Sequence, residues 1–168
     1  MRRLAPGEGA ALAAEELRAL PADARGCPLC AGASGHGAPE VLAQSASAIA
    51  LLDRYPSREG HIVVVTRAHV TRVAELREDD WLDVQRLSHR AVIALERVLA
   101  PRRVFVAALG SAEPLATSFP HVHVHVVPVA ERGEDARPAR VFSWSAGVLR
   151  YEGDEEARLA AKLRAAWG

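Results

Sequence analysis

The segment His121–Val127 constrains the fold and the chemistry of this chain more than any other. It reads His-Val-His-Val-His-Val-Val, so three of the seven histidines stand at every second position. Alternation with a period of two is typical of a half-buried β-strand, whose successive side chains point to opposite faces. We therefore predict a strand with all three imidazoles on one face and the valines on the other. At a rise of about 3.3 Å per residue, neighbouring imidazoles start roughly 6–7 Å apart.

The row of histidines could be catalytic, but it also has two simpler interpretations. The first is a valine-rich strand that happens to expose histidines. The second is a strip of metal ligands, because neutral imidazoles at alternate strand positions can share a cation. A loop with Gly110, Pro114 and Pro120 precedes the row and Pro128 lies just beyond it, which places the row in a confined setting.

Composition limits what the chain can bind. The chain has 168 residues, of which 49% are hydrophobic, and it lacks the roughly 18 consecutive apolar residues of a membrane span. We expect a single compact domain over residues 1–168. Lys and Arg balance Asp and Glu at 21 each, so no general field attracts nucleic acid or anionic membranes. With Glu8, Glu15 and Glu16 the start of the chain is a poor match to the apolar region of a secretory signal, and we expect a cytoplasmic protein.

The two cysteines form the motif Cys27-Pro-Leu-Cys30. In an extracellular protein this spacing is compatible with a disulfide, and in an intracellular one it indicates half of a zinc site or a redox pair. A redox pair is expected to open a helix directly after a strand. Here glycines surround the motif, and we expect a turn-rich knuckle over residues 26–39, which favours metal.

The order of predicted elements indicates the α+β class. We expect a sheet of five antiparallel strands with a long helix packed on it, flanked by terminal helices. The continuous β-branched run ending at Thr66 suits a central strand covered on both faces. The predicted strands are 41–44, 49–53, 61–66, 104–109 and 121–127, and the predicted helices are 8–20, 78–100 with an apolar stripe, and 154–167.

The row and its surroundings resemble the histidine triad family, whose signature is His-φ-His-φ-His-φ-φ with φ apolar. The family acts on nucleoside phosphates as hydrolases and nucleotidyl transferases. The resemblance implies a HIT-like five-stranded antiparallel sheet, usually paired into a homodimer, and a nucleoside phosphate or nucleotide-sugar-like small molecule as ligand. It covers roughly residues 27–128, so that helix 8–20 and the extension 131–168 lie outside it.

Attack on a nucleotide α-phosphate needs an unprotonated nucleophile and donors around the non-bridging oxygens. Neutral imidazole meets the first need near pH 7, and a covalent nucleotidyl-imidazole divides one hard displacement into two easier ones. The resemblance implies that His123 is the nucleophile, that His125 donates to the phosphate and that Ser118 contacts the leaving group. It makes His61, in Gly60-His61, a further member of the site. It makes Asp53, in Leu52-Asp53-Arg54-Tyr55-Pro56, the ligand of the ribose.

Taken without the resemblance, Asp53 is equally well a turn residue at the end of a strand, and His61 a residue that starts one. The chain also departs from the family pattern around Gly110, the expected loop glycine of the nucleotide site. Thr117 stands where the family commonly has glutamine, and Ala108 where it has asparagine. These changes remove two contacts to phosphate or ribose and bear on the substrate rather than on the nucleophile.

A zinc site needs four ligands in a tetrahedron, and Cys27 and Cys30 supply two. Zinc-bearing members of the family, and the related hexose-1-phosphate uridylyltransferases such as the galactose-1-phosphate enzyme, add two histidines. The resemblance places these at His69 and His121 and implies a closed, structural zinc. His36 is a competing fourth ligand, and an empty dithiol is the alternative to any metal.

Two classes of function follow. The first is an enzyme that hydrolyses or transfers nucleotides through His123, which the intact row favours. The second is a non-catalytic nucleotide-binding or zinc-stabilised interaction module, which the missing glutamine and asparagine favour. A third interpretation, a zinc scaffold with the row as a second metal strip, would show more than one metal per chain.

Overall fold

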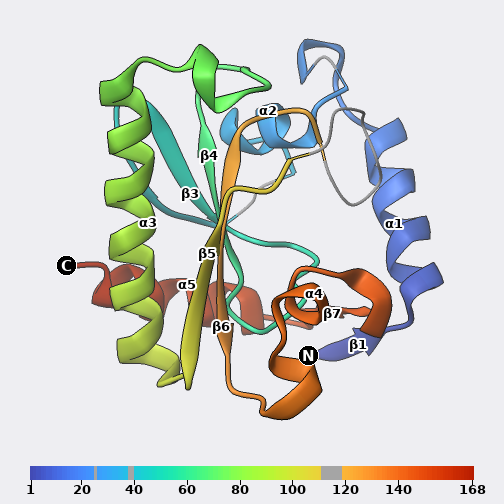
Figure 1. Cartoon of the computed structure of the whole chain (residues 1–168). Coiled ribbons are helices and arrows are strands. Elements are labelled where there is room, and N and C mark those ends of the chain that lie inside the picture. The colour runs from blue at the N-terminus through green and yellow to red at the C-terminus, as the bar shows by residue number, and fades with distance from the viewer. Residues whose placement is uncertain (25, 38–39, 111–118) are drawn as a thin grey trace.

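The computed structural model of the chain describes residues 1–24, 26–37, 40–110 and 119–168. Its centre is a five-stranded antiparallel sheet in the order β2-β3-β4-β6-β5, which confirms the α+β class (Figure 1). The strands are β2 (Val41–Gln44), β3 (Ala48–Leu52), β4 (Ile62–Thr66), β5 (Arg103–Ala107) and β6 (His123–Val129).

The central strand β4 is buried on both faces, as its run of β-branched residues predicts. Val64 pairs with Val124 of β6 and with Ala50 of β3, and all three belong to the main core. Val63 and Val65 point the other way into a smaller cluster. A strand with two apolar faces lies inside a sheet that is covered on both sides.

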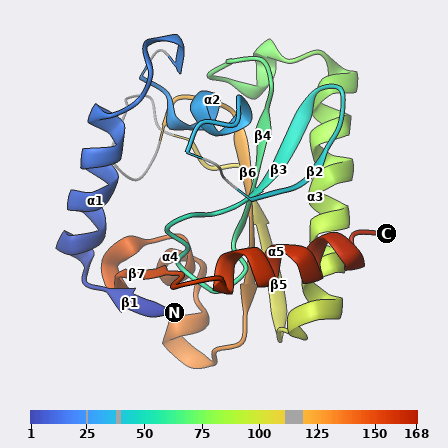
Figure 2. The same cartoon turned by 180° about the vertical axis from the view of Figure 1, so that it is seen from behind.

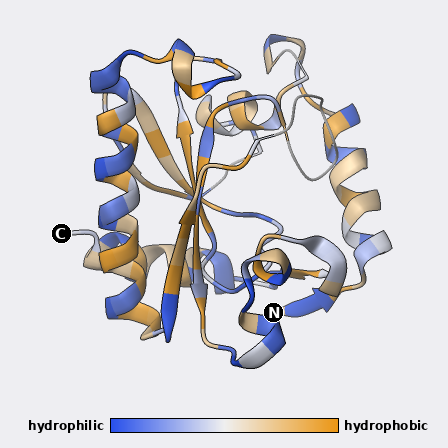
Figure 3. Ribbon diagram, in the orientation of Figure 1, coloured by the Kyte–Doolittle hydropathy of each residue, from blue (hydrophilic) through white to orange (hydrophobic). Residues whose placement is uncertain are grey.

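Two helices cover one face of the sheet, namely α3 (Glu78–Leu99) and α5 (Glu155–Ala166) (Figure 2). The predicted stripe of α3 faces the sheet, and Val84, Ala91 and Leu95 are fully buried. The first turn of α3 carries three acidic residues, which suits the positive end of a helix. In the hydropathy colouring, the apolar side of α3 is directed at the strands (Figure 3).

The opposite face of the sheet carries α2 (Pro28–Ala33), whose Leu29 and Ala33 pack on Val63 and its neighbours. The first helix, α1 (Pro6–Arg18), stands apart from the sheet, and a short α4 (Pro138–Val141) lies nearer β6 (Figure 1). The described residues also form four short 3₁₀ helices: Ala22–Ala24, Val73–Glu75, Gly133–Ala136 and Trp144–Ala146.

The two ends of the chain meet in a second sheet that the sequence pattern did not predict. Strand β1 (Arg2–Leu4) pairs with β7 (Val148–Arg150), and the pairing is antiparallel. Gly147 before β7 has a φ of 78°, and a Cβ there would lie 2.0 Å from the Leu4 carbonyl oxygen. Three-residue strands give too weak a periodic signal to be recognised without their partner.

Several predicted boundaries are wrong by one or two residues, such as that of strand 104–109, which spans Arg103–Ala107, and three of the differences have a clear local cause. The first helix spans Pro6–Arg18 instead of 8–20, because Pro6 fits the first turn of a helix and the helix ends before Pro21. The cysteine knuckle contains a helix, since Pro28 opens α2 directly after Cys27. The last strand begins at His123 rather than His121, because the N–H of His121 bonds to the Phe119 carbonyl and that of Val122 to the Val70 carbonyl, outside the β4–β6 ladder.

Among the described residues, no helix combines the length and the apolar composition that crossing a membrane requires.

Candidate active site and metal centre

Three strands bring the predicted catalytic residues to one face of the sheet. His123 and His125 lie on β6, on the face opposite to Val124 and Val126, as the alternation predicts. His61 directly precedes β4 and Asp53 directly follows β3, so that strand pairing places them side by side. The side chain of His61 is 7% exposed and that of Asp53 24%. The site is therefore shielded from bulk water.

These side chains form one continuous row of close polar contacts. His123 Nδ1 lies 2.6 Å from the carbonyl oxygen of His121, and His123 Nε2 lies 3.0 Å from His125 Nε2. His125 Nδ1 is 2.9 Å from His61 Nε2, and His61 Nδ1 is 3.0 Å from Asp53 Oδ2. The row thus runs from a backbone carbonyl to a carboxylate.

The row needs one proton more than three neutral imidazoles carry. One proton is needed in each of the three hydrogen bonds, and a fourth lies between His61 and Asp53 in their ion pair. The two end groups of the row supply none of these protons, because the His121 carbonyl and an ionised Asp53 are both acceptors. His123 Nδ1–H must donate to the His121 carbonyl. The extra proton then makes one of the three rings an imidazolium, namely His61, His123 or His125, depending on the direction of the bonds between them. In each case the negative charge of Asp53 balances it.

Burial decides where that positive charge lies. Desolvation lowers the pKa of both His123 and His125, so these two rings resist a charge. Burial also opposes ionisation of Asp53, but the adjacent His61 and the N–H of Tyr55 hold its pKa below the usual range. The extra proton is therefore placed between Asp53 and His61. In this arrangement His123 Nε2 keeps its lone pair, which is the form a nucleophile needs.

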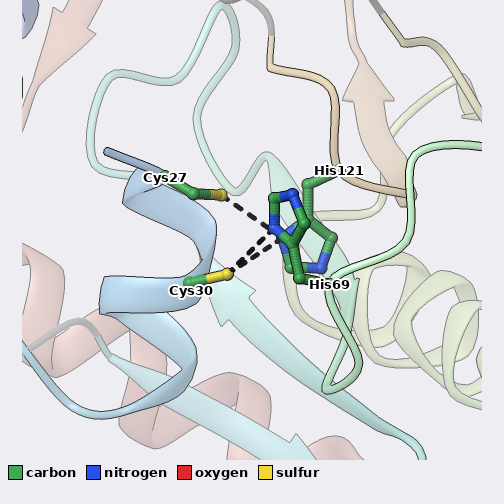
Figure 4. Close-up of side chains that lie close together, drawn as sticks. All are labelled: Cys27, Cys30, His69 and His121. Atoms are coloured by element: carbon green, nitrogen blue, oxygen red, sulfur yellow. Dashed lines mark hydrogen bonds between the residues drawn. The ribbon is translucent and has the colours of Figure 1, made fainter. Parts of the chain in front are cut away.

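A second cluster lies beside the row and joins three separated segments. Cys27 precedes α2, Cys30 lies in it, His69 follows β4, and His121 precedes β6 (Figure 4). Their sulfur and nitrogen ligand atoms all lie within 4.8 Å of one another. Cys27 Sγ is 3.3 Å from His121 Nδ1, and Cys30 Sγ is 3.2 Å from His69 Nδ1.

The cluster fits a tetrahedral zinc ion. Zn–S bonds of about 2.3 Å and Zn–N bonds of about 2.0–2.1 Å place sulfur and nitrogen ligands roughly 3.6 Å apart, close to the observed 3.2–3.5 Å. His121 Nε2 donates to the Thr66 carbonyl oxygen at 2.9 Å, which leaves Nδ1 unprotonated toward the cysteines. His36, the competing ligand, is not part of the group and lines the adjacent cavity.

His121 belongs to both centres. Its ring is fully buried and faces the cysteines, and burial lowers its pKa to about 4. Its backbone carbonyl accepts the Nδ1–H of His123. The prediction of three imidazoles sharing one site is therefore corrected: His121 turns to the cysteines because it lies before the β6 ladder, and only His123 and His125 join His61.

A cavity of about 790 Å³ opens onto the row. Asp53, His61, His123 and His125 line its floor, Leu51 and Val63 come from the sheet, and α1 and residues 142–144 supply the opposite wall. The predicted Gly110 is exposed and does not line this cavity. Ser118 and Thr117 lie outside the described residues.

Sequence reasoning missed the contribution of the terminal segments to this cavity. Glu16 of α1 accepts a hydrogen bond from the Tyr55 hydroxyl at 2.7 Å, and Trp144 packs edge-on against the Tyr55 ring at 6.2 Å. Phe142 lies 6.1 Å from the ring of His125. Only tertiary contacts join these residues, and nothing in their local pattern signals a site.

Comparison with known proteins identifies the class that this fold and this site define. The model of the HIT domain matches residues 38–132, which is more than half of the chain, so the protein belongs to the HIT domain family. The matching segment contains Asp53, His61 and all three histidines of residues 121–127, whereas α1 and the cysteine pair lie outside it, as does the C-terminal extension from residue 133 onward.

The relatives are distant. The chain is 30% identical over 88 residues to the adenosine 5′-monophosphoramidase hnt1 of Schizosaccharomyces pombe, a match that covers 52% of this chain and 62% of hnt1. A Zn-bound histidine triad family protein from Mycobacterium smegmatis superposes with a TM-score of 0.63 at 23% identity, covering 84% of this chain and 92% of that one. A hypothetical histidine triad nucleotide-binding protein from Sulfolobus tokodaii gives 0.66 at 19% identity, over 84% and 91%.

Proposed function

We propose that the protein hydrolyses, or transfers, the nucleotidyl group of a nucleoside 5′-phosphate derivative by attack of His123 on the α-phosphorus. The observation that carries the proposal is the contact between His123 Nδ1 and the His121 carbonyl, which holds the proton on Nδ1 and leaves Nε2 as a nucleophile. The phosphoramidase name of the S. pombe relative supports a hydrolase.

In the first step, the Nε2 lone pair of His123 forms a bond to the α-phosphorus. The bond from phosphorus to the leaving atom breaks, and its electron pair stays on that atom. The leaving atom takes the extra proton of the row, delivered through His125 from the Asp53–His61 end. Because the row already holds this proton, no ion has to enter the buried site from water.

In the second step, the oxygen of a water molecule bonds to phosphorus and the bond to His123 breaks, so that its electron pair returns to Nε2. A proton from the water refills the row, and a nucleoside monophosphate leaves. If a different hydroxyl group replaces water, the same step is a nucleotidyl transfer. His125 Nε2–H faces the phosphate oxygens, where charge develops, until its proton passes to the leaving atom in the first step, and the free Nε2 then accepts the proton of water in the second.

Asp53 serves two partners in this scheme. Its Oδ2 faces His61, and its Oδ1 accepts the Tyr55 N–H at 3.1 Å. An ionised carboxylate has further lone pairs, and these accept the ribose hydroxyls. We propose Ser118, in the loop between β5 and β6, as a further nucleotide contact, whereas Gly110 of the same loop does not line the cavity and its nucleotide contact stays a prediction.

We propose zinc as the ion of Cys27, Cys30, His69 and His121, in keeping with the four donor types and their spacing. When bound, zinc supplies a structural cross-link and no Lewis acid, since all four positions are occupied by the protein. It ties α2 to the ends of β4 and β6. The Zn-bound M. smegmatis protein of the same fold is consistent with this assignment.

Mass spectrometry of the intact protein after incubation with a nucleoside phosphoramidate tests the nucleophile. We expect a mass gain of one nucleotidyl group in the wild type, lost in His123→Ala together with at least about a thousandfold of the turnover. His89→Ala is the matched control, because His89 is exposed on α3. Full activity of His123→Ala would overturn the proposal.

The non-catalytic nucleotide-binding module remains the second candidate, favoured by Ala108 and Thr117 in place of the family's asparagine and glutamine. It predicts nucleotide affinity with neither an adduct nor turnover. The same experiment separates the two. We further propose that residues 1–168 act as one domain and that two copies form a homodimer.

A further inference from the structure

A second cavity, of about 400 Å³, lies further along the face of the sheet that carries the row of histidines. His125 on β6 is followed on the same face by Val129, which pairs with Arg103 of β5. Val129, Arg103 and Phe105 all line the cavity, which is therefore at the end of the sheet where β5 begins and β6 ends (Figure 1). Its volume is within the range of small-molecule sites.

Apolar side chains separate this second cavity from the histidine site. Val127, Val129 and Val141 form a buried cluster, and Phe105 and Phe142 pack against it. The ring centroids of Phe105 and Phe142 are 6.1 Å apart; Phe105 lines the smaller cavity and Phe142 the larger one. Among the described residues, none lines both cavities. A ligand in the smaller cavity would therefore not occupy the proposed nucleotide site.

Three arginines line this cavity, which we call the arginine cavity: Arg102 and Arg103 at the start of β5, and Arg132 after β6. All three are exposed, and in the part of the chain that the structure describes none of them forms an ion pair. The Arg102 N–H bonds to the Val129 carbonyl oxygen at 3.0 Å, which joins the two strands beside the cavity. Arg103 Cζ lies 5.8 Å from the centroid of the Phe105 ring. Three like charges at one concave site create a positive potential that attracts anions.

The one acidic residue among the described lining residues is engaged elsewhere. Glu131 Oε1 is 2.8 Å from Nε of Arg58, whose side chain is 8% exposed, and Glu131 Oε2 accepts the Ala130 N–H at 3.1 Å. Arg58 also donates to the carbonyl oxygens of Ser57 and Asp135, both at 2.8 Å. The buried Arg58 therefore neutralises Glu131 and holds it in place, so that this carboxylate does not offset the charge of the three lining arginines.

We propose that the arginine cavity binds a small organic phosphate, at a place separate from the histidine site. Guanidinium groups present paired N–H donors that match phosphate oxygens, and a doubly charged phosphomonoester offsets the repulsion among the three arginines. Phe105, Val129 and Ala136 supply an apolar part of the lining, which suits an aromatic body on the phosphate. The inference does not depend on the proposed catalytic function, because the two cavities have no described lining residue in common.

Titration calorimetry with phenyl phosphate at low ionic strength tests the site. We expect the wild type to bind this probe, and Arg102→Gln and Arg132→Gln each to weaken the binding by about tenfold, because each removes one charge-assisted contact. Arg86→Gln is the matched control: Arg86 is exposed on α3, which covers the other face of the sheet, and its loss should change the affinity by less than about twofold. Thermal unfolding checks that the variants fold, and either arginine variant suffices if the other does not.

Two further titrations separate the arginine cavity from other phosphate sites. In His123→Ala we expect the affinity for phenyl phosphate to be kept, whereas binding that is lost in His123→Ala and kept in the arginine variants would place the probe at the row and overturn the proposal. Inorganic phosphate should bind at least about tenfold more weakly than phenyl phosphate, because it lacks the ring that Phe105 and Val129 contact.

Equal affinity for inorganic phosphate and phenyl phosphate would show unspecific attraction of anions and contradict the proposal. Equal losses of affinity in Arg86→Gln and Arg102→Gln would do the same. The presence or absence of a His123 adduct bears on the proposed function alone, so that the two proposals fail independently.

Discussion

At the scale of single residues, the site depends on a count of protons. The four contacts from the His121 carbonyl to Asp53 require one extra proton, and desolvation of His123 and His125 keeps it near Asp53. In the proposed mechanism the carboxylate acts on His123, the proposed nucleophile, through the imidazoles of His61 and His125 without touching it. In this scheme Asp53 is a positioning residue, in addition to its proposed contact with ribose.

Asp53→Asn tests this role. If Asp53 only bound ribose, its replacement would raise KM and leave kcat unchanged. We expect kcat to fall by about a hundredfold, because an amide does not hold the extra proton and the leaving group then lacks its acid. The measurement is kcat and KM as functions of pH, with Asp53→Glu as the variant that keeps the charge. An unchanged kcat in Asp53→Asn would limit the residue to substrate binding.

The lowered pKa of Asp53 fixes the direction in which low pH changes the stability and the activity of the wild type. Because the pKa of Asp53 is lowered in the fold, the stabilisation from its pair with His61 is present above the unfolded-state pKa of about 3.9 and is lost as the pH falls through the lower folded value. Activity that depends on this carboxylate is lost over the same range.

At the scale of elements, α2 is too short to be stable alone. It has six residues and lacks a side-chain cap at its start, and helices of this length need tertiary support. Leu29 and Ala33 contact the sheet, and the two cysteines lie at its first turn. A metal ion held by the four ligands would therefore join α2 to the end of β4 and to the residues before β6, including the His121 carbonyl that contacts His123.

Replacing one of the four ligands should release the metal and show how much it contributes to the stability of the fold. We expect about one equivalent of zinc per chain in protein purified without a histidine tag, and less than about half an equivalent in Cys27→Ser and in His69→Ala. The melting temperature should fall by roughly 5–10 °C, as expected for a loss of a few kcal/mol in a chain of this size.

His36→Ala is the matched control, and it should keep its zinc because His36 lies outside the ligand group. Elemental analysis and thermal unfolding provide the two readouts. Zinc loss in His36→Ala, or full retention in His69→Ala, would show that the fourth ligand is wrongly assigned.

At the scale of the whole molecule, the two edges of the sheet differ. At β2, α5 covers the edge, and Arg164 Nε donates to the Val41 carbonyl oxygen at 2.7 Å. At β5 the described residues leave the edge open, and Val106 and Leu109 are 46% and 43% exposed. An open edge strand with apolar side chains is a template for pairing with a second copy.

Light scattering after size exclusion tests the homodimer. We expect a mass of two chains for the wild type and of one chain for Val106→Lys, because a charge on the edge strand opposes pairing. Val73→Lys introduces the same change at an exposed residue in a 3₁₀ helix away from this edge, and it should remain dimeric. A monomeric wild type at micromolar concentration would contradict the proposed assembly.

Local patterns in the sequence were enough to predict the frame of this protein. The period of two in residues 121–127, the β-branched run before Thr66 and the stripe of α3 each reflect a side-chain geometry that needs no knowledge of the rest of the chain. The cysteine spacing indicated a metal site for the same reason, and the family resemblance supplied the partners His69 and His121, which the fold then brought beside the cysteines.

What only the tertiary structure decided lies where residues far apart in the chain meet. The contact of Asp53 with His61 and the separation of His121 from the row follow from how β3, β4 and β6 pair. The part of the cavity lining that comes from α1 and residues 142–144 is held by contacts between distant segments, among them the pairing of β1 with β7. Short strands and single apolar residues leave no periodic trace, and the two strands β1 and β7 lie more than a hundred residues apart in the sequence, so that only the folded chain shows what they build.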